Sequence, residues 1–141
     1  MKTILNVCIL ALMSFGLNAG INTKKELNKM ERVIKDYAIG ADTRNIKLIE
    51  SSFHDNFQVV ASTKDGVRTI DKKTYISLIS KGKIGGSKRE LKIITSENDG
   101  LIGTAKLTLT GEKSVFYDYL TLLKVDGRWS IVSNVTSIQA R

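Results

Sequence analysis

An acidic residue, Asp118, lies within the most apolar part of the sequence, residues 114–135. Because side chains of an extended strand alternate between its two faces, Asp118 shares a face with Phe116 and Leu120. A carboxylate among apolar neighbours is costly unless it is paired, and burial raises its pKa. Asp118 is therefore a candidate to move a proton or to bind a polar ligand atom in a pocket. The alternative is that it pairs with a Lys or Arg of the neighbouring strand, or lies at the pocket mouth.

The single histidine, His54, is the second candidate for acid–base chemistry, because the pKa of an imidazole is close to neutral. We expect it at the end of a short helix, where its alternative role is to hydrogen-bond the helix end or the next loop. One histidine, a single cysteine at Cys8 and no spaced pair of carboxylates make no recognisable set of metal ligands. We therefore predict neither a metal nor a cofactor.

Aromatic side chains could line a pocket around Asp118, since they offer flat apolar faces and, in Tyr and Trp, a polar donor. The predicted pocket consists of Tyr37, Phe57, Tyr75, Phe116, Asp118 and Trp129. For two of them core packing is the alternative, because Tyr37 ends the apolar face of a helix and Trp129 opens the last strand.

Three helices are predicted to position these residues. Apolar residues recur at spacings of three and four from residue 23 onward, which indicates an amphipathic helix that ends at Gly40. Asp42 is the expected cap of a short second helix, and Asp71 that of a third. The loop at 81–89 is basic and rich in glycine. It is either a mobile rim that attracts an anionic ligand or a flexible connection between helix and strand.

Strands make up the rest of the predicted fold. Residues 57–61 and 67–70 form a short hairpin between the second and third helices, and apolar residues alternate with polar ones from residue 91 onward. Asp126 and Gly127 fit a two-residue type I′ turn between the last two strands. Helices followed by a mostly antiparallel sheet predict an α+β domain.

The first nineteen residues have the layout of a secretory signal peptide. A positive start precedes an apolar run at 4–17, and Ala19 fits the residue before the cut. Cys8 lies inside this segment, so the mature chain would contain no thiol. We expect residues 20–141 to be exported as a single domain, to the periplasm or as a secreted protein, with no membrane attachment after cleavage.

The chain is basic, with 22 Lys and Arg against 14 Asp and Glu and a formal net charge of +8. Its basic residues are scattered along the sequence and are not interleaved with aromatic residues, as a nucleic-acid stacking platform requires. We therefore expect a solvated basic surface and no nucleic-acid partner.

The order of elements and three stretches of sequence resemble the nuclear transport factor 2-like (NTF2-like) superfamily. The stretches are VIKDYAIG at 33–40, FHDNF at 53–57, and FYDYLTLL at 116–123 followed by DGRWSIV at 126–132. Within the superfamily, the chain is most similar to exported bacterial proteins grouped as putative lumazine-binding or SnoaL-like. The resemblance implies a cone of three helices packed on a curved sheet, a pocket between them, and homodimers that form through the outer sheet face.

Two functions follow from these expectations. The first is an exported domain that binds a small apolar or aromatic molecule in its cone without catalysis. The alternative is an isomerase or dehydratase, because superfamily enzymes of this kind place an Asp, His or Tyr in the cone to transfer a proton. In that case Asp118 would act as acid or base with His54 or a tyrosine. A single carboxylate and an unpaired histidine favour binding.

Overall fold

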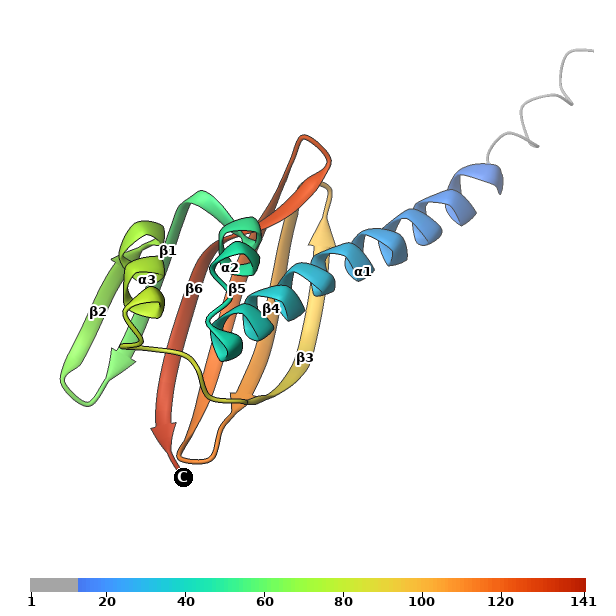
Figure 1. The fold of residues 1–141 in the computed structure, drawn as a ribbon. Coiled ribbons are helices and arrows are strands. Elements are labelled where there is room, and N and C mark those ends of the chain that lie inside the picture. Colours follow the sequence, from blue (N-terminus) through green and yellow to red (C-terminus); the bar gives the residue numbers. More distant parts are fainter. Residues whose placement is uncertain (1–12) are drawn as a thin grey trace, which may run out of the picture.

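Three helices lie on one face of a six-stranded sheet in the computed structural model, which describes residues 13–141 (Figure 1). The helices are α1 (Met13–Thr43), α2 (Ile46–Ser52) and α3 (Lys72–Ser80). The strands are β1 (Phe53–Thr63), β2 (Gly66–Asp71), β3 (Glu90–Asp99), β4 (Ile102–Thr110), β5 (Ser114–Val125) and β6 (Arg128–Ala140).

The sheet has the order β2-β1-β6-β5-β4-β3. All neighbouring strands are antiparallel except β1 and β6, which run parallel. The predicted α+β architecture, with helices on a curved and mostly antiparallel sheet, is confirmed. Figure 1 shows α1 crossing the sheet obliquely, with its N-terminal part extending beyond the β3 edge.

Helix α1 is longer than predicted at both ends. Most of the predicted signal peptide, 1–19, lies outside the described residues, and its last residues belong to α1, so its cleavage stays a prediction. Gly40 does not end the helix, which continues to Thr43. Gly40 instead allows α2 to pack closely, since a Cβ there would lie 2.9 Å from Cγ1 of Ile49.

The caps of the shorter helices agree with the prediction in one case of two. Asp71 caps α3 as predicted, because its side chain accepts a hydrogen bond from the backbone N–H of Thr74 at 2.8 Å. Helix α2, however, is capped by Asn45. The predicted cap, Asp42, lies in the last turn of α1 and binds Arg89 instead.

The structure confirms the predicted hairpin turn between the last two strands, and the first strand starts earlier than predicted. Asp126 and Gly127 have φ angles of 50° and 76°, as a type I′ turn requires. Strand β1 begins at Phe53 rather than at residue 57, so His54 lies in a strand and not at a helix end.

The core fills the space between the helices and the inner sheet face. Alternate residues of β4 and β5 are buried there, as the sequence pattern predicts. They are Ala105, Leu107, Leu109, Leu120 and Leu122. Within residues 13–141, no helix combines the length and hydropathy needed to cross a membrane.

Candidate ligand-binding site

Asp118 lies inside the cone, with 1% of its surface exposed. Its Oδ2 accepts one hydrogen bond from the Tyr37 hydroxyl at 3.3 Å and another from Nδ2 of Asn134 at 3.0 Å. These donors come from α1 and β6, so three elements meet at one carboxylate. The residues opposite Asp118 on the neighbouring strands are Leu107 and Thr136, so the predicted alternative of an ion pair with a strand neighbour does not hold.

Three polar atoms around this carboxylate have no hydrogen-bond partner among the described residues. They are Oδ1 of Asp118, Oδ1 of Asn134 and Oγ1 of Thr136, all buried. The Thr136 hydroxyl lies near enough to lower the pKa of Asp118 as a hydrogen-bond donor, but the geometry between the two side chains falls short of a hydrogen bond. A buried polar atom left without a partner costs about 1–3 kcal/mol. We call Tyr37, Asp118, Asn134 and Thr136 the polar cluster.

Burial is the largest cause of the pKa shifts in and beside the polar cluster. It raises the pKa of Asp118 above its ordinary value, while the Thr136 hydroxyl and the Asn134 amide act in the opposite direction. Burial also raises the pKa of Tyr37 well above its usual range, and that of Tyr75 to about 12. Both tyrosines therefore keep their hydroxyl protons at neutral pH and can donate hydrogen bonds.

Aromatic rings form one wall beside the polar cluster. Phe53 and Phe57 stack with their ring centroids 3.6 Å apart, and the Tyr75 ring meets Phe53 edge-on at 5.3 Å. The Tyr37 ring lies 5.5 Å from Phe53. With Asp118, which Tyr37 contacts, the structure thus brings together four of the predicted pocket residues, Tyr37, Phe57, Tyr75 and Asp118. Phe53 was not predicted. An irregularity of β1 between Phe53 and Gln58 accompanies the stacking of its ring on Phe57.

Trp129 packs against α1 and lines the same surface groove as Phe53. Its Nε1 donates a hydrogen bond to Oε2 of Glu26 at 2.9 Å, and Lys124 Nζ lies 2.7 Å from the same oxygen. Side-chain hydrogen bonds from Lys124, Lys29 and Trp129 lower the pKa of Glu26 to about 2. This arrangement is the core-packing alternative for Trp129, at the β5–β6 end of the sheet.

Asp118 does not line the cavity in which His54 lies. His54 lines a surface groove of about 690 Å³, together with Asp36, Glu50 and Trp129. Its Nδ1 accepts a hydrogen bond from the backbone N–H of Asn56 at 3.1 Å. The partner, Asn56, lies in β1 itself, so this hydrogen bond joins neither the helix end nor the loop that the alternative role requires. The hydroxyl that donates a hydrogen bond to Asp118 is that of Tyr37.

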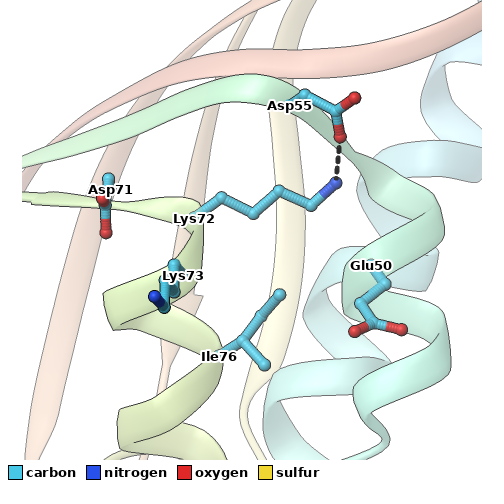
Figure 2. A pocket seen from close by; sticks show the side chains of 6 residues that line it. All are labelled: Glu50, Asp55, Asp71, Lys72, Lys73 and Ile76. Carbon is cyan, nitrogen blue, oxygen red and sulfur yellow. Dashed lines mark hydrogen bonds and ion pairs between the residues drawn. The ribbon is translucent and has the colours of Figure 1, made fainter.

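A second, smaller cavity of about 370 Å³ lies between α2 and α3 (Figure 2). Lys72 extends across it, and its Nζ donates hydrogen bonds to Oδ1 of Asp55 and to the Phe53 carbonyl, both at 3.0 Å. The hydrogen bond and the charge of Lys72 lower the pKa of Asp55. The pair ties the start of β1 to α3, which is a structural role.

Phe116 lies at the opposite end of the cone from Trp129, beside a third cavity of about 540 Å³. Arg89 also lines this cavity, and its guanidinium carbon lies 5.1 Å from the centroid of the Phe116 ring. Asp42 accepts hydrogen bonds from Arg89 Nε at 2.6 Å and from its backbone N–H at 2.8 Å. In residues 13–141 no group of three or more His, Cys, Asp and Glu side chains could hold a metal ion.

Several solved structures have the same fold. An NTF2-like protein of unknown function from Silicibacter pomeroyi is 17% identical, with a TM-score of 0.74 over 82% of this chain and 98% of that chain. One from Shewanella baltica is 18% identical, with a TM-score of 0.73 over 82% and 94%. A ketosteroid isomerase-like protein from Erwinia carotovora atroseptica is 12% identical, with a TM-score of 0.67 over 82% and 98%.

These likenesses confirm the NTF2-like fold and leave function open, since one fold hosts many sites. No curated protein matches the chain. The model of one protein family matches residues 25–136, which is most of the sequence. The protein thus has an NTF2-like fold and belongs to the family described as "Putative lumazine-binding".

Proposed function

We propose that the protein binds a small apolar or aromatic molecule between its helices and its sheet, and that it does so without catalysis. The observation that carries this proposal is the set of three buried, unpartnered atoms in the polar cluster. The family description supports a small-molecule ligand; we carry over this class of ligand and not lumazine itself.

The chemistry of the polar cluster defines part of the ligand. Asn134 Oδ1 can only accept a hydrogen bond, whereas the Thr136 hydroxyl can both donate and accept. A ligand that presents an N–H or O–H group beside a flat apolar ring would satisfy these atoms and contact the aromatic wall of Phe53, Phe57 and Tyr75. Such a ligand removes a cost that the empty protein otherwise bears.

Native mass spectrometry tests this proposal on protein expressed from its own Met1 and purified gently from its host. We expect an additional mass that disappears on denaturation, and we expect Asp118→Ala to lose it. Asp99→Ala, which changes an exposed carboxylate of β3, is the matched control and should keep it. Wild-type protein without additional mass, or an Asp118→Ala variant that is folded by circular dichroism and equally loaded, would contradict the proposal.

An enzyme that transfers a proton is the second candidate, favoured by the 3.3 Å contact between the Tyr37 hydroxyl and Asp118. In an isomerase or dehydratase, Asp118 would take a proton from carbon and return it, with Tyr37 as the partner. His54 lies in a separate groove, so we assign it no part in this chemistry. Incubation of the captured molecule with protein in D₂O should then replace a C–H by C–D, and Asp118→Asn should stop the exchange. Full retention of protium would rule this candidate out.

We further propose that the protein is exported and that it forms homodimers. Export rests on the signal-peptide pattern at 1–19. The dimer is supported by apolar side chains on the sheet face that the helices leave uncovered. Ile102, Tyr119 and Val135 are each more than half exposed there, and Tyr119 lies directly opposite Val135.

A further inference from the structure

The cavity beside Phe116 lies between the loop that precedes β3 and the turn between β4 and β5. Its lining includes Lys88, Arg89, Glu112, Lys113 and Phe116. Phe116 shares the inner face of β5 with Asp118, two residues further along the strand. We therefore call this space the entrance cavity, since it reaches the sheet face on which the polar cluster lies.

One wall of the entrance cavity is held in place by Arg44. Its guanidinium donates hydrogen bonds to three carbonyl groups of the loop, those of Gly82, Ile84 and Gly85, at 2.9–3.4 Å. The Gly86 N–H also binds the Ala41 carbonyl at 2.9 Å. The loop expected to be a mobile rim or a flexible connection is thus tied to the end of α1. Because this wall is already ordered before a ligand binds, less conformational entropy is lost on binding.

Arg89 lies at the inner side of this cavity, with 12% of its side chain exposed. Asp42 occupies its Nε, and the Phe116 ring lies against its guanidinium. Its Nη2 is buried and has no hydrogen-bond partner among the described residues. A guanidinium cannot lose its proton in a protein. The Nη2 group of Arg89 is therefore a positively charged hydrogen-bond donor that can bind an acceptor atom of a ligand.

The charges around Arg89 favour an acceptor with a single negative charge. Asp42 already offsets the Arg89 cation, and the lining adds Lys88 and Lys113 against Glu112. Burial raises the pKa values of Tyr37, Tyr75 and Asp118, and the positive charge of Arg89 opposes this rise in each of them. Arg89 therefore lines the entrance cavity and acts electrostatically on the polar cluster.

We propose that the ligand is an aromatic or apolar carboxylic acid whose carboxylate binds Nη2 of Arg89 in the entrance cavity. Its apolar body lies against Phe116 and extends along β5 towards Asp118. Ile138, opposite Phe116 and 39% exposed, widens this apolar surface. This inference rests on the proposed function and adds the chemical class and orientation of the ligand.

The test compares two probes of nearly equal shape, 2-naphthoate and its neutral amide 2-naphthamide, by fluorescence titration of the full chain. We expect the wild type to bind naphthoate about tenfold more tightly, as one charge-assisted hydrogen bond of about 1.4 kcal/mol provides. The preference should shrink in high salt, which screens the lysines at the rim.

Three variants locate the carboxylate. Arg89→Met keeps the apolar stem of the side chain and should abolish the preference for naphthoate. Because this substitution leaves the Asp42 carboxylate without its partner, the double variant Arg89→Met/Asp42→Asn removes that charge and should show the same loss of preference in a stably folded protein. Lys88→Met with Lys113→Met changes only the rim and should reduce the preference two- to threefold. Lys92→Met, an exposed lysine of β3 outside the cavity, is the control and should leave it unchanged.

The outcomes separate this inference from the proposed function. Equal binding of the two probes by the wild type would overturn the acid assignment and leave small-molecule binding intact. A preference for naphthoate that survives loss of Arg89 would overturn the placement of the carboxylate. Binding of neither probe would overturn the inference, while the captured mass described above decides the proposed function independently.

Discussion

A carboxyl group held in an apolar core by neutral donors affects stability in a way that depends on pH. Because burial raises the pKa of Asp118, the folded protein binds this proton more tightly than the unfolded chain. The resulting stability is fully present below the unfolded value of about 3.9 and is lost as pH rises through the raised folded pKa. Above the raised folded pKa, the ionised Asp118 therefore lowers the free energy of unfolding.

Asp118→Asn should remove this dependence. The carboxamide keeps an oxygen for Tyr37 and Asn134 and adds an N–H for the unpartnered oxygens of the polar cluster. We expect the variant to be more stable than the wild type by about 1 kcal/mol at pH 7, with a smaller gain at pH 4. Urea unfolding at both pH values measures the difference. An equal loss of stability at every pH would show that the carboxylate is well stabilised as an anion.

Glu26 is expected to behave in the opposite way. Its pKa is lowered to about 2, so its contribution to stability is present above the unfolded pKa of about 4.3 and is lost as pH falls towards 2. Glu26→Gln should lower the melting temperature at pH 7 and flatten its decline in acid. The fluorescence of Trp129, the only tryptophan, reports the transition. Glu97→Gln on β3 is the matched control, and an identical acid profile for the two variants would refute the role of Glu26.

At the scale of elements, the loop between α3 and β3 depends on a close approach to α1. Gly85 has a φ of +70°, and a Cβ there would collide with the Ala41 carbonyl oxygen. Gly100 has a similar φ of +60° but open space around it. Gly100→Ala should therefore cost only the backbone penalty of about 1 kcal/mol, and Gly85→Ala at least twice as much. Equal losses in chemical denaturation would mean that the loop is free to move.

Element types were predictable where the signal is local. The cap at Asp71, the Asp126-Gly127 turn and the alternation of β4 and β5 each depend on neighbours in sequence, and each is confirmed. Asp42 was assigned wrongly as a cap because its partner, Arg89, lies 47 residues away. A local motif cannot show that a distant cation competes for the same side chain.

The polar cluster was only partly predictable for a related reason. A regular hairpin about Asp126 and Gly127 would place Val135 opposite Asp118. A bulge between Thr121 and Leu122 shifts the register by one residue, so Thr136 faces Asp118 instead. The Tyr37 hydroxyl reaches Asp118 from α1, 81 residues away. Its residue type suggested a pocket, but only the packing of α1 on the sheet determines that contact.

For the whole molecule, the uncovered sheet face predicts its state of assembly. Val135→Asp would place a charge directly opposite Tyr119 on this face, so we expect a dimeric wild type and a monomeric variant by light scattering. Val67→Asp, at an exposed apolar residue of the edge strand β2, should remain a dimer. A monomeric wild type would contradict the assembly proposed here.

The crystal structure of protein purified with its captured molecule is the most direct test of the central claim, that the polar cluster binds a ligand. The account predicts a polar ligand atom within hydrogen-bond distance of Asp118 Oδ1, Asn134 Oδ1 or Thr136 Oγ1, with the ligand ring against the aromatic wall. A cone in which ordered water alone bridges these three atoms would contradict it, because the polar cluster would then be a hydrated part of the core.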